Sequence, residues 1–225
     1  MKEPQIPASC IQEIYNSPYI HLYDLQYERG RHYLNASRRK KQDLAASKSL
    51  QEFKNMTPDA VSIFTIVLRE GQEPAMLLTR EFRYPAGQYL LSVPAGLIDP
   101  ADGQAEGESA PLAAARREIR EEAGVILGEK DSVNLINPLV FSSPGMTDES
   151  NALVCILYHP QEGAQFSSEG TVGAERIDDY FLVNEEQARQ IITAGTDSEG
   201  IYYPVYTWMA LMYFLSGMWK DFLRK

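Results

Sequence analysis

The chain has 225 residues, of which 44% are hydrophobic, and this length supports one sizeable core with room for a small accessory lobe. Its 31 acidic and 21 basic residues give a net charge of −10, which excludes a protein that coats nucleic acid through a basic face. An acidic protein can still bind a nucleotide where a metal ion and a few arginines supply local positive charge.

The start of the chain differs in character from the rest, so we divide it into a small N-terminal antiparallel β subdomain, residues 1–57, and a main domain, residues 58–225. The opening sequence, MKEPQIPASC, lacks the apolar core of a secretory signal. The two cysteines, Cys10 and Cys155, are too few for a disulfide framework. We therefore expect a cytoplasmic protein.

The N-terminal subdomain contains one clear hairpin pattern. An aromatic-rich run at residues 19–27, a turn and a returning run at residues 32–36 predict two antiparallel strands. His21 and His32 are expected to be sheet residues, because no metal-ligand spacing accompanies them. The basic run that follows is expected to face solvent.

The main domain opens with two strands that read as a hairpin. Residues 61–68, VSIFTIVL, have almost no polar interruption, which predicts a strand that is buried on both faces. A turn and a second strand at residues 75–79 follow. Further on, LLSVPAG predicts a short apolar strand and a bend, which can present a backbone carbonyl to the helix that comes next.

Three glutamates lie within the sequence REIREEAGV at residues 117–125. Glu118, Glu121 and Glu122 fall within roughly 100° of arc on a helix that turns about 100° per residue. Like charges at this spacing repel one another, and a divalent cation would offset the repulsion. Mg²⁺ prefers oxygen ligands of this kind. The alternative is a solvated helix face, which mixed acidic and basic residues usually form.

The same helix has an apolar side. Four residues at 3-4-4 spacing form a candidate core stripe, and Gly124 is suited to end the helix in the left-handed conformation. The stripe consists of Leu112, Ala115, Ile119 and Ala123. The segment therefore predicts a helix with one apolar side and one acidic side.

Beyond the helix, we expect the strand NLINPLVF within residues 131–141 and another strand at residues 151–158, joined by the loop SPGMTDES. A loop of this composition between two strands is typical of a mobile active-site lid, or of an ordinary polar connection. Residues 161–173 are polar and rich in glycine and serine, so we expect a flexible surface loop there.

The C-terminal part predicts a strand at residues 177–183, then a helix that starts with a capping sequence at Asn184 and ends at Gly195. Residues 205–219 are apolar all round, but too few to span a bilayer of about 30 Å. We expect a buried helix, a candidate for a subunit interface, and no membrane partner. This order of elements predicts a mixed sheet between helices, an α/β (α+β) layered fold.

Three motifs in this order resemble a known family. REIREEAGV is similar to the end of the Nudix box, while PAGLID before it and SPGMTDE after it are similar to the ADP-ribose (ADP-sugar) pyrophosphatase branch. The resemblance covers about residues 61–183. It implies a Nudix-type α/β/α sandwich. It also implies that the N-terminal piece packs against a second subunit in a homodimer and borders the substrate cleft.

The resemblance also implies a set of metal ligands. Glu118 and Glu122 are the expected main ligands of Mg²⁺, or of Mn²⁺ in its place, and the carbonyl of Ala95 completes the site. Glu121 is expected to join through water or a further metal ion. Arg117 lies one turn before Glu121, so it can hold the carboxylates in place.

Two more residues match functional positions of the family. A glutamate in the SPGMTDES loop is the candidate base that activates water; Glu149 matches it, and Asp148 is its rival. The arginine of the EFRYP segment contacts the phosphates or ribose of the substrate, and Arg83 matches it. A surface arginine beside a turn is the alternative for Arg83.

The spacing of the box departs from the family pattern, which places its glycine six residues before its first glutamate and that glutamate eight before the arginine. Here Gly96 is twelve residues before Glu108, and Glu108 is nine before Arg117. Read strictly backwards from Arg117, these positions hold Ser109 and Gly103. We prefer Gly96 and Glu108, with PADGQAE as an insertion, and expect Glu108 on the substrate side of the site.

The expected activity is Mg²⁺-dependent hydrolysis of the pyrophosphate bond of a nucleoside diphosphate linked to a sugar. ADP-ribose would give AMP and ribose 5-phosphate. The alternatives are hydrolysis of another nucleotide sugar such as GDP-mannose, a Nudix module that senses a nucleotide sugar without cutting it, and a non-enzymatic acidic scaffold. The three intact glutamates argue against the sensing module, because a sensor does not need a full metal site.

Overall fold

The computed structural model describes residues 6–104, 107–170 and 176–224. The chain divides into two compact units, Met1–Asp59 with Leu139–Asn151, and Ala60–Pro138 with Ala152–Lys225. The first five residues, the last two residues of the expected insertion and residues 171–173 of the expected loop lie outside the described ranges. The division into functional domains at residue 57 stays a prediction.

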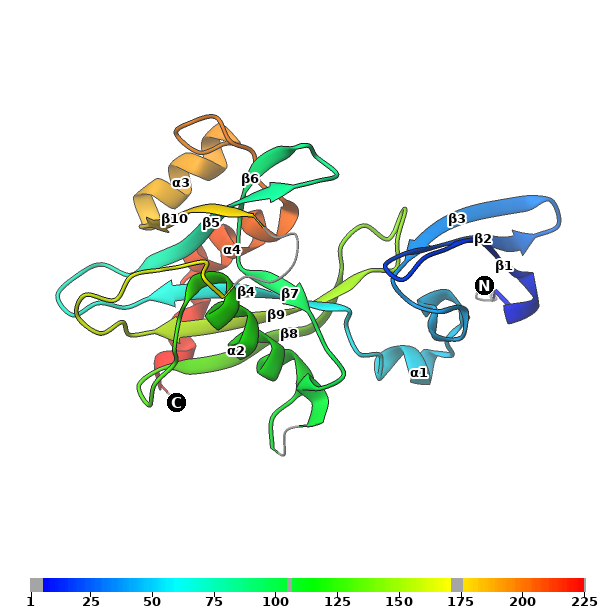
Figure 1. The fold of residues 1–225 in the computed structure, drawn as a ribbon, viewed down its shortest axis with the longest axis horizontal. Coiled ribbons are helices and arrows are strands. Elements are labelled where there is room, and N and C mark those ends of the chain that lie inside the picture. Colours follow the sequence, from blue (N-terminus) through cyan, green and yellow to red (C-terminus); the bar gives the residue numbers. More distant parts are fainter. Residues whose placement is uncertain (1–5, 105–106, 171–175, 225) are drawn as a thin grey trace. The chain divides into compact units, whose positions relative to one another are not determined.

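The first unit is built around a three-stranded antiparallel sheet in the order β1-β2-β3 (Figure 1). The strands are β1 (Ile11–Asn16), β2 (His21–Glu28) and β3 (Arg31–Ser37). β2 and β3 are the predicted hairpin, with Tyr23 opposite Asn35. Our sequence-based predictions omit β1, which pairs with β2. Both histidines lie in strands, and His32 Nδ1 forms a hydrogen bond of 2.6 Å with Asp24.

A small apolar core lies under this sheet, and it consists of Ile11, Tyr23, Leu25 and Leu44. The helix α1 (Leu50–Lys54) begins with a capping box in which Ser49 and Glu52 satisfy each other's backbone N–H groups. Short 3-10 helices occur in both units, at Ala8–Cys10, Lys41–Asp43, Ala45–Ser47, Asp102–Gln104 and Met218–Arg224.

The second unit is organised by a seven-stranded sheet in the order β10-β5-β4-β9-β8, with β6 paired to β5 and β7 paired to β4. The strands are β4 (Ala60–Val67), β5 (Ala75–Arg83), β6 (Gln88–Ser92), β7 (Ala95–Leu97), β8 (Ser132–Phe141), β9 (Ser150–Tyr158) and β10 (Ile177–Val183). Every residue of β4 is buried, as its apolar sequence predicts.

The sheet is mixed, because its central strands pair in both directions. β4 and β5 form the predicted antiparallel hairpin, with Ile66 opposite Met76. The Asp59 N–H donates to the Ser150 carbonyl and the Leu68 N–H to the Tyr158 carbonyl, so partners advance together along β4 and β9. That progression is the signature of parallel strands.

Helices cover both faces of this sheet (Figure 1). α2 (Ala110–Ala123) packs its predicted stripe against β4 and β9 in a core that includes Val61, Ile63 and Val154. On the opposite face, α4 (Val205–Ser216) brings Tyr213 to 5.9 Å from the ring of Phe64. Side chains alternate between faces along a strand, so Ile63 and Phe64 point to different layers. The predicted α/β/α sandwich and its separate antiparallel β unit are confirmed.

α3 matches its expected limits, whereas α4 starts as expected but ends three residues early, at Ser216 instead of residue 219, and is less buried than expected. α3 (Glu185–Ala194) has the predicted capping box at Asn184 and ends at Gly195 with φ 78°. α4 was expected to be buried, yet Trp208 is 43% exposed and Met212 is 42% exposed. Within the described ranges, no helix has the length and apolar character needed to cross a membrane.

Candidate active site

The acidic helix α2 is fixed at both ends by features of its own sequence. Pro111 lies in the first turn, where a missing N–H costs nothing, and Gly124 ends the helix in the left-handed conformation with φ 65°. Ile119 and Ala123 are fully buried in the core below the helix. This anchoring fixes the direction in which the glutamates on its other side point.

Glu118 and Glu122 are one helical turn apart and almost buried, with exposed fractions of 6% and 3%. The turn at residues 95–96 lies directly against them. The N–H of Ala95 donates to Glu122 Oε2 at 3.2 Å. A Cβ atom on Gly96 would lie 1.9 Å from the carboxylate carbon of Glu118, so only glycine leaves room for this carboxylate. The structure therefore brings Ala95, Glu118 and Glu122 together, as the sequence predicts.

Arg117 forms hydrogen bonds with several charged groups on and near α2. Its Nη1 donates to Glu118 Oε1 at 2.6 Å and to Glu121 Oε2 at 3.2 Å. Its Nη2 donates to the Leu97 carbonyl at 2.8 Å and to Asp102 Oδ2 at 3.0 Å. Hydrogen bonding to Asp102, and then to Glu118, raises the pKa of this guanidinium above its ordinary value. Arg117 therefore orients one metal-ligand candidate while it neutralises part of the local negative charge.

Asp102 is a member of the site that our sequence-based predictions missed. It is 8% exposed and receives hydrogen bonds from Arg117 and, at 2.8 Å, from the N–H of Asp99. Burial alone would raise the pKa of Asp102, but these hydrogen bonds outweigh burial and lower the pKa. The signal was available, because Asp102 is six residues after Gly96, where the box pattern has its first carboxylate.

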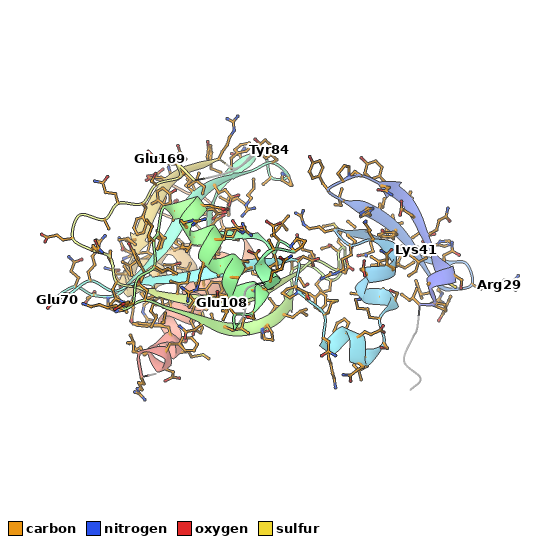
Figure 2. The ribbon with its side chains drawn as sticks, turned by 60° about the horizontal axis from the view of Figure 1, so that its bottom comes forward. Arg29, Lys41, Glu70, Tyr84, Glu108 and Glu169 are labelled. Carbon is orange, nitrogen blue, oxygen red and sulfur yellow. The ribbon has the colours of Figure 1, made fainter. Side chains whose placement is uncertain are left out.

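Glu108, which we preferred for that position, pairs with a different arginine. The Arg116 Nε donates to Glu108 Oε1 at 2.8 Å. Figure 2 labels Glu108 beside the start of α2. Assigning the first carboxylate position to Asp102 keeps the six-residue spacing from Gly96, and it places the extra residues after Asp102 instead of at residues 100–106 as we expected.

The oxygen atoms gathered here are the kind of ligands that a hard divalent cation binds. In this structure, however, two of the carboxylates are bound to an arginine. Carboxylate and carbonyl oxygens are the ligands that Mg²⁺ takes, and two nearly buried carboxylates require positive charge nearby. Within the part of the chain that the structure describes, no three His, Cys, Asp or Glu side chains are spaced as a metal-holding group. Arg117 lies between Glu118 and Glu121 instead, and supplies the positive charge.

Arg83 ends β5, and its guanidinium pairs with a buried acid on the same strand. Arg83 Nη2 lies 2.6 Å from Glu81 Oε2, and Glu81 is 7% exposed. Phe82 between them points to the other face, where its ring makes edge contacts with Tyr84 and Tyr89. Glu81 therefore gives the Arg83 guanidinium a charged partner on the same strand, while the Arg83 side chain stays 41% exposed beside the turn at residues 84–87.

The loop at residues 143–150 belongs to the first unit, and it distinguishes the two candidate bases. Glu149 is partly accessible and pairs with Arg38, whose Nε donates to Glu149 Oε1 at 2.9 Å. Asp148 is buried, accepts a hydrogen bond from the Ala45 N–H at 3.1 Å and lies 3.7 Å from Arg39. Asp148 is thus held inside this unit, whereas the carboxylate of Glu149 is partly exposed.

This α/β/α sandwich, with acids and an arginine on one helix against a tight turn, defines a Nudix-type domain. The family model described as the NUDIX domain matches residues 56–204, well over half of the chain. The chain belongs to the Nudix family, and the resemblance seen in its motifs is confirmed.

Several relatives carry more specific names. The chain is similar to putative nudix hydrolase 2 of Caenorhabditis elegans, with 39% identity over 98 residues that cover 44% of this chain and 39% of that protein. It is similar to the ADP-sugar pyrophosphatase of Mus musculus, with 35% identity over 103 residues, 46% of this chain and 42% of that protein. The ADP-ribose pyrophosphatase of Saccharomyces cerevisiae is 33% identical over 99 residues, 44% of this chain and 38% of that protein.

These matches span only about two fifths of the length of the relatives. A solved structure described as an ADP compounds hydrolase has a TM-score of 0.53 and 15% identity, and covers 96% of this chain and 94% of its own. At that identity the likeness concerns the fold alone.

Proposed function

We propose that this protein is a divalent-cation-dependent hydrolase that cuts the pyrophosphate bond of a nucleoside diphosphate linked to a sugar. ADP-ribose is the substrate that we favour, with AMP and ribose 5-phosphate as products. The observation that carries the proposal is the pair of nearly buried carboxylates, Glu118 and Glu122, set against the turn at residues 95–96. The names of the mouse and yeast relatives support the substrate class.

Glu118, Glu122 and the carbonyl of Ala95 would hold Mg²⁺, or Mn²⁺ in its place, and Glu121 would contribute at the edge of the same site. When bound, the cation reduces the repulsion between a pyrophosphate and attacking water and orients the phosphates. Arg117 keeps the Glu118 carboxylate in one orientation through its 2.6 Å hydrogen bond.

Glu149 is the proposed base, because its carboxylate is accessible and can accept a proton from the attacking water. Arg83 is the proposed contact to the substrate, since an arginine fork matches the paired oxygens of a pyrophosphate. Its 41% exposed side chain leaves the guanidinium accessible to a substrate, with Glu81 as its charged partner on the strand. Asp102 takes the role of orienting Arg117, which leaves Glu108 with Arg116 at the substrate side of the helix start.

We also propose a homodimer that forms through residues 1–57. Ile14, Tyr15 and Tyr19 are 52%, 56% and 80% exposed in this part of the chain, and a second copy would remove these apolar side chains from water. The two free cysteines suit a reducing cytoplasm. Light scattering on the purified protein tests the dimer: a monomer at micromolar concentration would contradict it.

A substrate panel tests the activity directly. Purified protein is incubated with ADP-ribose, GDP-mannose, UDP-glucose or NADH, with and without Mg²⁺, and the products are separated by ion-exchange chromatography. We expect AMP and ribose 5-phosphate from ADP-ribose only when Mg²⁺ is present. Tight binding of ADP-ribose without cleavage would identify a sensing module instead, and faster cleavage of GDP-mannose would replace the favoured substrate.

A further inference from the structure

The C-terminal end of α2 is held by groups from outside the helix. A helix leaves its last four carbonyls without intrahelical partners. In α2 the Tyr180 hydroxyl donates to the Glu122 carbonyl at 2.5 Å, and the Ser167 N–H donates to the Ala123 carbonyl at 3.2 Å. Tyr180 comes from β10, and Ser167 belongs to residues 166–170, which we call the strap. Two of these end carbonyls are therefore hydrogen-bonded to groups outside the helix.

The strap is packed on the unit rather than loose on its surface. The Phe166 ring stacks on the Tyr180 ring with centroids 5.8 Å apart, and both pack against the core below α2. The side chain of Ser168 also forms a hydrogen bond with Tyr180. We expected a flexible surface loop here. The segment is a loop with exposed residues, but an isolated phenylalanine in its polar sequence anchors it to the core.

Gly170 brings the strap into direct contact with the backbone of the acidic helix. A Cβ atom at this position would lie 2.8 Å from the Glu121 carbonyl oxygen and 2.9 Å from its Cα. Backbone atoms of a helix cannot swing aside as a flexible side chain can. Figure 2 labels the neighbouring Glu169 near the end of α2 opposite to Glu108.

We propose that Tyr180 and the strap form a clamp that positions the last turn of α2, so that Glu121 and Glu122 present their carboxylates to the divalent cation. The clamp rests on the proposed function, and Tyr180 is a positioning residue that acts through the backbone of Glu122. Glu122 is then fixed twice, by Tyr180 at its carbonyl and by the Ala95 N–H at its carboxylate. An end that frays would lose this placement, because the last turn of a helix is its least ordered part.

The test compares cation affinity in two clamp variants. Tyr180→Phe removes the hydroxyl and keeps the ring that stacks on Phe166, and Gly170→Ala forces the strap away from Glu121. Mn²⁺ affinity is measured from the electron paramagnetic resonance signal of the free ion, together with kcat and KM for ADP-ribose at limiting and saturating Mn²⁺. We expect both variants to bind Mn²⁺ about tenfold more weakly. Their kcat should return toward the wild-type value at saturating Mn²⁺.

Tyr213→Phe is the matched control, because it also removes the hydroxyl of a half-buried tyrosine, one that bonds Cys155 on the other face of the sheet. It should lower the melting temperature without changing Mn²⁺ affinity. Wild-type Mn²⁺ affinity in both clamp variants would overturn the clamp alone, as would an equal loss of affinity in Tyr213→Phe. A wild-type protein that binds no Mn²⁺ would overturn the proposed function and the clamp with it.

Discussion

Glu122 on α2 and Glu149 in the loop at residues 143–150 differ in how tightly the structure fixes their carboxylates. Glu122 is 3% exposed, and both its carboxylate and its carbonyl are bound. Glu149 has a side chain that is 31% exposed and shares one oxygen with the guanidinium of Arg38. Metal ligands work best when their geometry is set in advance, whereas a base must approach a water molecule that arrives with the substrate. The difference predicts a rigid metal side and an adjustable base.

Removing one of the proposed metal ligands on α2 should cause the largest loss of activity. Glu122→Gln keeps the size of the side chain but removes its charge, so the cation loses one of its two nearly buried carboxylate ligands. Losing a residue that only supports a ligand costs about 10- to 100-fold, and we expect more than about 100-fold loss of Mg²⁺-dependent kcat/KM here. Chelation of Mg²⁺ should reduce wild-type activity at least as far.

Circular dichroism is the control for this variant, because the fold should survive the change. A folded Glu122→Gln protein with near wild-type turnover would overturn the ligand assignment. An unfolded one would show that the buried carboxylate serves the core, and Glu118→Gln would then replace it in the assay.

The base should give the next largest effect, and with a different signature. Glu149→Gln should lower kcat by about 100- to 10,000-fold, the range for loss of a positioned proton acceptor. Mn²⁺ affinity should not change, because we propose Glu149 as a base and not as a ligand of the cation. Steady-state kinetics and metal titration of the same preparation measure both quantities.

Asp148→Asn separates the two neighbouring acids. Asp148 is buried beside Arg39 and accepts a hydrogen bond from the Ala45 N–H, so its loss should lower the free energy of unfolding. Turnover per folded molecule should remain near that of the wild type. If Asp148→Asn were folded and inactive while Glu149→Gln stayed active, the two assignments would be exchanged.

A smaller effect should distinguish the two carboxylates that compete for one role in the Nudix box. Asp102→Asn weakens the bonds that orient Arg117, and through Arg117 the carboxylate of Glu118. We expect about tenfold weaker Mn²⁺ binding, at the lower end for a residue that supports a ligand. Glu108→Gln should leave this affinity unchanged, because Glu108 bonds Arg116. The reverse result would restore the assignment that we preferred from the motifs.

The sequence predicts a helix or strand well when neighbouring residues carry the signal, either as an apolar pattern or as residues typical of helix ends. β10 spans the predicted residues, and α3 begins and ends where its cap and its glycine indicate. β1 escapes prediction because only its first residue is buried, so no alternation marks it. The exposed side of α4 could not be predicted either, because composition shows that a helix is apolar but not which of its sides is covered by other elements.

The site is predictable where its residues lie on one helix, and not where distant segments meet it. The spacing of Glu118 and Glu122 is a property of the helix itself. The bond from Tyr180 to Glu122 joins residues 58 positions apart, and no local pattern encodes it. Asp102 is an intermediate case. The spacing of the Nudix box from Gly96 indicates Asp102 as the first carboxylate, but the extra residues before α2 make Glu108 a second candidate for that position.

The smallest expected effect comes from removing the arginine that pairs with Glu149, and it tests whether Glu149 can act without a fixed partner. The ion pair between Arg38 and Glu149 is largely solvated, with side chains 44% and 31% exposed, and such pairs contribute about 0.2–1 kcal/mol. Arg38→Gln should therefore change the free energy of unfolding by less than about 1 kcal/mol and kcat/KM by only a few-fold.

Arg39→Gln is the contrasting variant, because that arginine is 9% exposed and bonds Asp59, and breaking a buried pair costs about 3–5 kcal/mol. Chemical denaturation and kinetics on both variants decide the matter. If Arg38→Gln reduced kcat/KM as much as Glu149→Gln does, Glu149 would depend on a fixed partner. The contrast between a rigid metal side and an adjustable base would then fail.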